Sequence, residues 1–156
     1  MSEINVITTF FNALKRSDPE TVQNCYHEEG TFSDPVFGPL DPRHSKAMWE
    51  MLLTNNDDLE VEYEILEQSE SSAKVKWLAD YTLRKTKRKV SNPIVSNFVL
   101  KEGKIFRQVD DYDLYKWSKM ALGSSGTLFG WTSLVQNKIR EDVLKTLEFY
   151  MNAKGK

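Results

Sequence analysis

The sequence has a single cysteine, Cys25, among 156 residues, which excludes an intramolecular disulfide. Its neighbours on a predicted helix are apolar, so we interpret Cys25 as a buried structural thiol. His27 and His44 are the only histidines, so the side chains that commonly bind zinc are scarce. No metal-ligand spacing, glycine-rich phosphate loop or Ser-His-Asp order occurs either, and we expect neither a metal nor a cofactor.

Long apolar runs are also missing, and no stretch is long enough to cross a bilayer. The first residues, Met1–Glu3, lack the basic segment and apolar run of a signal peptide, so we expect a cytoplasmic protein. Neither sign of charge predominates, since the chain has 21 basic and 23 acidic residues and a net charge of -2. This balance gives no reason to expect a nucleic-acid partner or an anionic membrane, and we interpret the basic run at 85–89 as a solvated turn.

Aromatic residues, in contrast, are plentiful. The chain has four Trp, six Tyr and eight Phe, and 40% of its residues are hydrophobic. A chain of this length can bury about 70% of the surface that it exposes when unfolded. We therefore expect residues 1–156 to form a single domain with one packed core.

The first part of the chain predicts three helices. Apolar residues recur at helical spacing at four positions: Ile4, Ile7, Phe11 and Leu14. Asp18-Pro19 supplies a cap and a first-turn proline for a second helix, which we expect to end at Gly30. Asp41-Pro42 repeats this start, and the third helix is predicted to run to about Leu53.

From Leu59 the hydrophobic period changes to two, which is typical of strands with one face in water. The alternating segments are 59–65, 75–83, 94–100 and 104 to about 116, preceded by a short extended piece at 31–34. Short connections between the long strands predict an antiparallel meander. Helical periodicity returns after Trp117 and again from Ser133, with a flexible stretch at 123–126 in between. Helices segregated from a sheet indicate the α+β class.

Four segments resemble the nuclear-transport-factor-2-like superfamily, and more closely its SnoaL-like and ketosteroid-isomerase-like members. They are 10–14 with Asp18, 31–37 with its Asp-Pro pair, 47–52, and 103–113. The stretch 113–117, followed by 128–131, also resembles a bacterial subgroup in which the last strand continues toward a long terminal helix. The resemblance implies a cone-shaped curved antiparallel sheet wrapped around three N-terminal helices, with an additional C-terminal helix and one deep pocket.

Asp34 is the first candidate catalytic residue. By resemblance it stands where ketosteroid isomerase keeps the carboxylate that shuttles a proton next to a carbonyl group. A carboxylate at the lip of an apolar cavity is partly desolvated, which raises its pKa toward the range useful for proton transfer. The alternative is structural, because an Asp before Pro35 can simply end a strand and cap the following turn. The sequence leaves both interpretations open.

The oxyanion hole of the isomerase is not reproduced. The resemblance puts Phe10 where a tyrosine hydroxyl is expected and Ser96 where a protonated aspartate is expected. A phenyl ring donates no hydrogen bond and a serine is a weaker donor, and losing one such donor typically costs about 2.7–4 kcal/mol of transition-state stabilisation. We therefore expect no steroid isomerase activity of the usual kind, although Tyr63 or Tyr81 could replace the donor.

The last predicted strand carries the second candidate. Period-two alternation places four residues on one face: Phe106, Gln108, Asp110 and Tyr112. By resemblance this face points into the cone, and Asp110 then lies near the acid–base aspartate of SnoaL-type cyclases. Gln108 stands where the resembled subgroup leads us to expect a histidine, which removes a titratable partner. The alternative is a solvated acidic strand end. Arg107 falls on the face opposite Asp110, so the Asp-Arg-Asp arrangement of limonene epoxide hydrolases is not supported.

Further residues are expected to shape the ligand pocket: Phe10, His44, Trp49, Ser96, Gln108 and Tyr112. His44 shares a helix face with Met48 and Met51, and the alternative for it is a satisfied core or rim residue. We interpret His27, beside two glutamates at a helix end, as a surface residue.

These residues support three hypotheses. The first is an acid–base isomerase or cyclase for a small hydrophobic carbonyl compound, with Asp34 as the base and Asp110 as the acid. The missing donors at Phe10 and Ser96 motivate the second, a non-catalytic module that binds a hydrophobic ligand. The third is a protein-interaction module, for which the segment 128–131 is a lid, a dimer contact or a docking surface. Because sheet-face homodimers are common in the resembled superfamily, we expect a homodimer.

Overall fold

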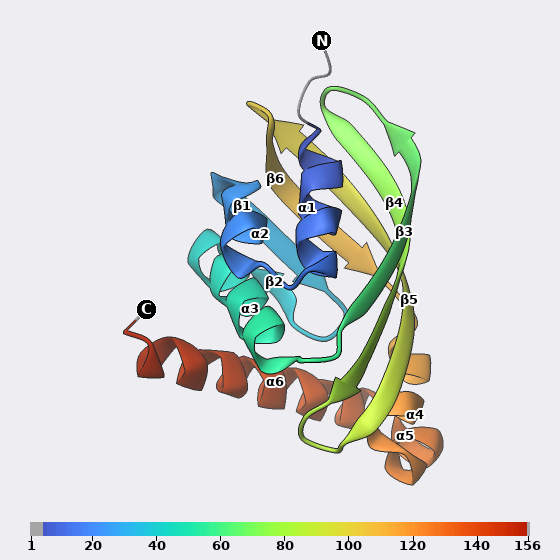
Figure 1. The fold of residues 1–156 in the computed structure, drawn as a ribbon. Helices are drawn as coiled ribbons and strands as arrows, with labels where there is room; N and C mark the ends of the chain where they lie inside the picture. The colour runs from blue at the N-terminus through green and yellow to red at the C-terminus, as the bar shows by residue number, and fades with distance from the viewer. Residues whose placement is uncertain (1–4, 156) are drawn as a thin grey trace.

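The computed structural model describes residues 5–155. Met1–Glu3 and Ile4, on which the signal-peptide and first-helix predictions partly rested, lie outside the described residues. Six strands form one curved sheet in the order β2-β1-β6-β5-β4-β3, and its two edge strands do not pair to close it. Figure 1 shows α1, α2 and α3 on the inner side of this sheet and α6 lying across the end of the cone.

The helices are α1 (Val6–Lys15), α2 (Pro19–Asn24), α3 (Pro42–Asn55), α4 (Leu114–Leu122), α5 (Ser124–Phe129) and α6 (Ser133–Ala153). The strands are β1 (Tyr26–Asp34), β2 (Gly38–Leu40), β3 (Glu60–Gln68), β4 (Ser72–Leu83), β5 (Arg88–Lys101) and β6 (Lys104–Asp111). The predicted α+β cone is confirmed. The sheet is mixed, however, because β1 pairs in parallel with β6 while the other neighbours are antiparallel.

Aspartate caps begin α2 and α3, as two of the sequence signals predicted. Oδ1 of Asp18 accepts a hydrogen bond from the Thr21 N–H at 3.1 Å, and Oδ1 of Asp41 accepts one from the His44 N–H at 2.8 Å. Each carboxylate satisfies an N–H that has no partner within its helix. The same chemistry at Asp113 starts α4, so the last strand ends at Asp111 and not near residue 116 as predicted.

Gly30 does not end the second helix, which was predicted to reach it. The helix stops at Asn24, and Gly30 lies inside β1, where the pairing with β6 shifts register between Tyr26 and Thr31. A Cβ atom at Gly30 would lie 2.5 Å from the backbone oxygen of Ile105. The glycine is therefore required by the close approach of two strands. The stretch predicted to be flexible, 123–126, is also ordered, because α5 begins at Ser124.

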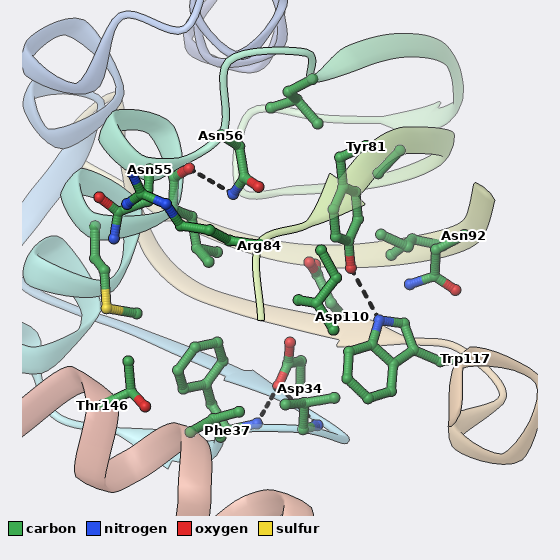
Figure 2. A pocket seen from close by; sticks show the side chains of 18 of the residues that line it. Asp34, Phe37, Asn55, Asn56, Tyr81, Arg84, Asn92, Asp110, Trp117 and Thr146 are labelled. Atoms are coloured by element: carbon green, nitrogen blue, oxygen red, sulfur yellow. Dashed lines mark hydrogen bonds between the residues drawn. The ribbon is translucent and has the colours of Figure 1, made fainter. Parts of the chain in front are cut away.

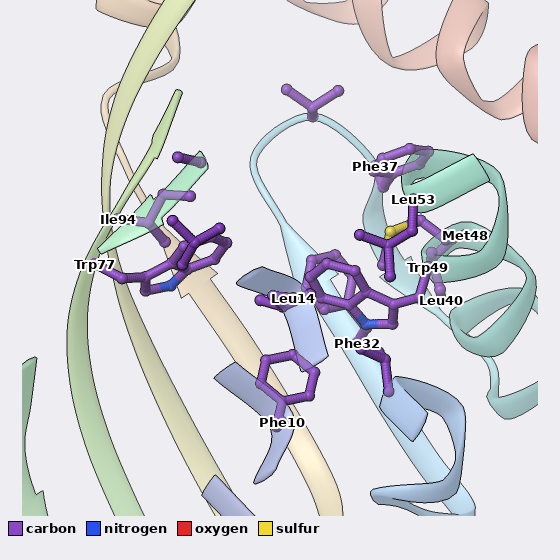
Figure 3. Close-up of a cluster of buried hydrophobic side chains, with 14 of the residues drawn as sticks. Phe10, Leu14, Phe32, Phe37, Leu40, Met48, Trp49, Leu53, Trp77 and Ile94 are labelled. Atoms are coloured by element: carbon purple, nitrogen blue, oxygen red, sulfur yellow. The ribbon is translucent and has the colours of Figure 1, made fainter. Parts of the chain in front are cut away.

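An aromatic cluster packs α1 against the inner face of the sheet (Figure 3). Phe10 and Phe11 are fully buried. The Phe10 ring meets the edge of Trp49 with centroids 5.4 Å apart, and Phe11 meets Trp77 at 5.5 Å. Such edge-to-face pairs add to the free energy gained by burying the rings. Cys25 is buried beside this core, and desolvation raises the pKa of its thiol to about 11, in agreement with the predicted structural role.

Within residues 5–155, none of the helices combines the length and the apolar character that a bilayer span requires.

Candidate active site inside the cone

A cavity of about 540 Å³ opens inside the cone between the sheet, α3 and α6. Most of its lining is apolar and includes three of the four tryptophans, Trp49, Trp77 and Trp117. A few polar side chains interrupt this surface, and Figure 2 shows Asp34, Tyr81 and Asp110 among them. A volume of this size is within the range of small-molecule sites in proteins.

Asp34 ends β1 and lines the cavity. Its Oδ1 accepts hydrogen bonds from the N–H groups of Val36 at 3.0 Å and Phe37 at 2.6 Å, and its Oδ2 accepts one from the Tyr112 hydroxyl at 3.1 Å. Desolvation outweighs these bonds and raises the pKa of Asp34 to about 6. Both interpretations of the sequence therefore apply to this side chain. Oδ1 caps the turn, and the carboxyl group as a whole lines the cavity.

Asp110 lies on β6, the strand next to β1, and is 5% exposed. Ser96 Oγ donates a short hydrogen bond to its Oδ1, and Gln108 Nε2 donates another at 2.9 Å. Desolvation, with a further contribution from the charge of Asp34, raises the pKa of Asp110 to about 7. Both donors reach the same oxygen, so Oδ2 is the atom left to hold a proton toward the cavity.

A chain of buried hydrogen bonds supports Asp110 from behind. Trp49 Nε1 donates to the Tyr26 hydroxyl at 3.1 Å, which donates to Gln108 Oε1 at 2.5 Å. On the other side, Trp77 Nε1 donates to Ser96 Oγ at 2.8 Å. Because Gln108 Oε1 accepts a hydrogen bond from the Tyr26 hydroxyl, the orientation of the Gln108 amide is fixed and its N–H group points at Asp110.

Tyr81 on β4 also lines the cavity. Its hydroxyl accepts a hydrogen bond from Trp117 Nε1 at 2.9 Å. In the described part of the chain no acceptor takes the proton of this hydroxyl. Burial raises the pKa of Tyr81 above its usual value, so the proton stays on the oxygen and is available as a donor.

Seven of the eight predicted site residues form two groups, which differ in whether the side chain lines the cavity. Four of them, Asp34, Trp49, Asp110 and Tyr112, line the cavity. Three others, Phe10, Ser96 and Gln108, are fully buried and do not line it. Ser96 and Gln108 act on Asp110 through hydrogen bonds, whereas Phe10 packs in the aromatic cluster.

His44 lies outside the cavity, on the side of α3 that meets α6. Its Nδ1–H donates to Asp41 Oδ1 at 2.8 Å, and its Nε2–H donates to Glu148 of α6. These two carboxylates raise the pKa of His44, with Glu148 the larger cause. The structure therefore supports the rim interpretation of this residue.

The alternation predicted that Phe106 shares the inward face of β6 with Gln108 and Asp110, and this prediction is wrong. Val99 pairs with Arg107 but Leu100 pairs with Ile105, so Phe106 is the extra residue of a bulge. Ile105 is fully buried instead. Arg107 is exposed while Asp110 is buried, as the alternation predicted for that part of the strand.

The segment 128–131 carries exposed apolar side chains that do not line the cavity. Leu128 is 62% exposed and Trp131 is 66% exposed. In the structure this segment therefore does not form a lid over the cavity.

Trp117 and Arg84 are among the cavity residues that the sequence analysis did not assign to the site. Trp117 was interpreted only as part of a family-like segment, and Arg84, which also lines the cavity, was not considered. Trp117 reaches Tyr81 across 36 residues of chain, and no local pattern signals such a contact. No group of three or more metal-binding side chains comes together among residues 5–155.

Comparisons with known proteins support the same architecture. The sequence model of the family described as "SnoaL-like domain" matches residues 7–108. A search of curated proteins finds no match.

One similar solved structure is a hypothetical protein with a ketosteroid isomerase-like fold from Catenulispora acidiphila, in complex with trimethylamine. It superimposes on this chain with a TM-score of 0.66 at 13% identity, and the match covers 84% of this chain and 99% of that one. An epoxide hydrolase of M. tuberculosis, described as LEH-like, gives 0.60 at 17% identity, with 80% and 92% covered. The epoxide hydrolase/cyclase-like enzyme SalBIII, described in pyran ring formation in salinomycin, gives 0.61 at 19% identity, with 71% and 90% covered. At these identities the similarity concerns the fold.

Proposed function

Because the chain belongs to the SnoaL-like domain family, we propose that it is an acid–base enzyme that isomerises or cyclises a small hydrophobic carbonyl compound in its cavity. The observation that carries the proposal is the pair of cavity carboxyls, whose pKa values are raised to about 6 at Asp34 and about 7 at Asp110. Near neutral pH such a pair can hold one base and one acid in the same apolar space.

The proposed reaction begins with proton abstraction. Ionised Asp34 removes a proton from the carbon next to the substrate carbonyl. The C–H electron pair forms a carbon–carbon double bond, and the C=O π pair moves onto the oxygen to give an enolate. Where the substrate has a carbon–carbon double bond conjugated with the enolate, Asp34 then gives the proton to the far carbon of that double bond. The double bond moves next to the carbonyl and the C=O bond forms again, which completes an isomerisation. In a cyclisation the enolate carbon attacks a second carbonyl, and Asp110 gives its Oδ2 proton to the new alkoxide.

The enolate oxygen needs hydrogen-bond donors. The phenyl ring at Phe10 offers none, and Ser96 directs its hydroxyl to Asp110. Tyr81, with its free hydroxyl proton, and protonated Asp110 are the groups that we assign to this task. Buried donors aimed at developing charge are worth far more than donors in water.

Deuterium exchange tests the proposal without knowledge of the natural substrate. Incubation with apolar cyclic ketones in D₂O near pH 6.5 should give enzyme-dependent incorporation at the carbons next to the carbonyl, followed by NMR. Asp34→Asn should abolish incorporation. Asp111→Asn, on the opposite face of β6 from Asp110, is the matched control and should leave the rate unchanged. Equal rates for the wild-type protein and Asp34→Asn would remove Asp34 from the mechanism.

Ligand binding without turnover is the second candidate function, and the largely apolar lining with its three tryptophans favours it. Native mass spectrometry that finds an unmodified hydrophobic molecule retained in the protein, together with no deuterium exchange, would support this function.

A homodimer also belongs to the proposal, and the exposed apolar segment 128–131 supports it. Light scattering that gives a monomer at every concentration would contradict the dimer.

A further inference from the structure

Arg84 is a charged side chain of the cavity without a structural task. It follows β4, lines the cavity, and in the part of the chain covering residues 5–155 it makes no ion pair and no hydrogen bond. Two other arginines near the cavity have side-chain partners. Arg88 donates to the Met120 carbonyl at 2.8 Å, and Arg140 donates to the Pro35 carbonyl at 2.9 Å. Arg84 is exposed, so water hydrates its guanidinium when the cavity is empty, and its five N–H donors are free to bind an anionic ligand there.

Arg84 is also separate from the carboxylate pair. In Figure 2 its side chain extends on the side of Asn55 and Asn56, away from Asp34 and Asp110. The cation that acts on the pKa of Asp34 is Arg140, and the charge that acts on Asp110 is that of Asp34. The cavity therefore has an acidic end, where the proposed chemistry occurs, and a cationic end at Arg84.

The surroundings of Arg84 supply polar groups but no neutralising anion. The side chain of Asn55 has no hydrogen-bond partner among the described residues, and the side chain of Asn56 donates its Nδ2–H to the Leu52 carbonyl at 2.7 Å. Asp142 of α6 lines the cavity too, but Lys138 pairs with it at 3.0 Å. An amide donor and an unpaired guanidinium at one end of an apolar cavity suit a planar anionic group.

We propose that Arg84 binds a carboxylate of the substrate, so that the substrate is an elongated apolar carbonyl compound with a carboxylate at the end remote from the reacting carbonyl. The assignment of the reacting end rests on the proposed function, whereas the binding of the carboxylate at Arg84 does not. Asn55 donates a second hydrogen bond to the same group. The apolar body of the substrate spans the space between the two ends.

Paired probes test this subsite. The protein is titrated with 4-cyclohexylbutanoate and with the neutral 4-cyclohexylbutanamide, following the fluorescence of the cavity tryptophans Trp49, Trp77 and Trp117. At pH 8 both cavity aspartates are ionised and repel an anion, so a carboxylate gains affinity only at the cationic end, where Arg84 and Lys85 line the cavity. We expect the acid to bind about tenfold more tightly than the amide, in line with one charge-assisted contact.

Variants assign that preference to Arg84. Arg84→Met keeps an unbranched apolar stem of similar length and should bind both probes equally, while Arg84→Lys should keep part of the preference. Lys89→Met removes an exposed cation that does not line the cavity and should bind like the wild-type protein, and thermal melting shows that each variant is folded. Equal affinities in the wild-type protein, or an undiminished preference in Arg84→Met, would overturn the inference.

The test separates this inference from the proposed function. If deuterium exchange is absent while the Arg84-dependent preference is present, the proposed reaction is wrong and the anion subsite stands. If exchange occurs while both probes bind equally, the reaction stands and the subsite is wrong.

Discussion

Asp34 and Asp110 line one cavity from neighbouring strands, and the charge on Asp34 contributes to the raised pKa of Asp110. Two carboxyls that interact in this way release their protons in two steps that belong to the pair. Asp34 has the lower pKa, about 6 against about 7, so the singly ionised pair holds its charge on Asp34 and its proton on Asp110.

The pH dependence of deuterium exchange follows from this arrangement. The rate should rise as Asp34 loses its proton near pH 6 and fall as Asp110 loses its proton near pH 7. We expect a bell-shaped profile with its maximum between these values. In Asp110→Asn the alkaline limb should disappear, and a profile that keeps this limb would show that another group is responsible for it.

Asp110 should also make the folding stability depend on pH. Its folded pKa of about 7 lies above the ordinary value of 3.8, so the folded state binds the proton more tightly than the unfolded chain. The stability that this provides is complete below pH 3.8 and is lost as the pH rises through 7. Asp110→Asn can keep Oδ1 as an acceptor for Ser96 and Gln108, so it should raise the free energy of unfolding at pH 8 by on the order of 2–4 kcal/mol.

Urea unfolding at pH 5 and pH 8 measures this effect. The gain in Asp110→Asn should be much smaller at pH 5, where the wild-type carboxyl is already neutral. Asp111→Asn should show little change at either pH, because Asp111 is exposed. A variant destabilised at pH 8 would mean that Asp110 is ionised and stabilising in the folded protein.

Tyr81 can be tested as the donor to the enolate. Removal of its hydroxyl in Tyr81→Phe should slow exchange by about 10²–10³-fold, the usual effect of losing one oxyanion donor. Affinity for unreactive cavity ligands should change little, because the hydroxyl acts on charge that develops during the reaction. Tyr63→Phe is the matched control, since Tyr63 donates to Asn12 and does not line the cavity.

Trp117 lines the cavity and should act on kcat through Tyr81. Trp117→Phe removes the 2.9 Å hydrogen bond that orients the tyrosine hydroxyl and should lower kcat by about tenfold, within the range expected for loss of a buried hydrogen bond. The smaller ring also changes the cavity wall, so KM is measured separately. In a Tyr81→Phe background the same change should have no further effect on kcat. Additive effects of the two substitutions would argue against this positioning role.

His44 should hold α6 in place in a pH-dependent manner. Its pKa is raised by Glu148 and Asp41, so its contribution to stability is complete below the unfolded pKa and is lost as the pH rises through the folded value. Hydrogen exchange of α6 amides should therefore increase with pH beyond the intrinsic increase, and His44→Gln should remove that excess. His27→Gln, which affects a contact with Glu102, should leave α6 exchange unchanged.

Gly30 should tolerate no side chain. A Cβ atom would lie 2.5 Å from the Ile105 oxygen and 3.0 Å from the His27 oxygen, both of them backbone atoms. Separating β1 from β6 to admit a methyl group should cost about 1–3 kcal/mol of stability, as overpacking usually does. Chemical denaturation of Gly30→Ala, with the exposed Glu29→Ala as control, measures this cost.

Local patterns were enough to predict most of the fold. Asp-Pro pairs at 18–19 and 41–42 marked two helix starts because a carboxylate cap and a first-turn proline act within four residues. Alternation placed Gln108 and Asp110 on one face of the strand, and the resemblance pointed that face into the cone. Alternation failed at Phe106, because a bulge is set by the pairing of β6 with β5 and leaves no mark on the period of one strand.

The site was predictable only in part. Asp34 and Asp110 came from resemblance and alternation, and the structure brings both to one cavity. The contact of Trp117 with Tyr81 depends on how α4 folds back against the sheet, so it could not be predicted from neighbours in the chain. The contact of His44 with Glu148 could not be predicted either, because its partner on α6 lies about a hundred residues later in the chain.

The wall that α6 contributes has a consequence for the synthesis of the protein. Ile139, Val143 and Thr146 line the cavity, and they leave the ribosome after every strand of the sheet and all the other helices. Until they arrive, the hollow that holds Trp49 and Trp77 faces water on one side. Nascent chains that stall in this interval expose an apolar surface that chaperones bind, and docking of the last helix ends that exposure.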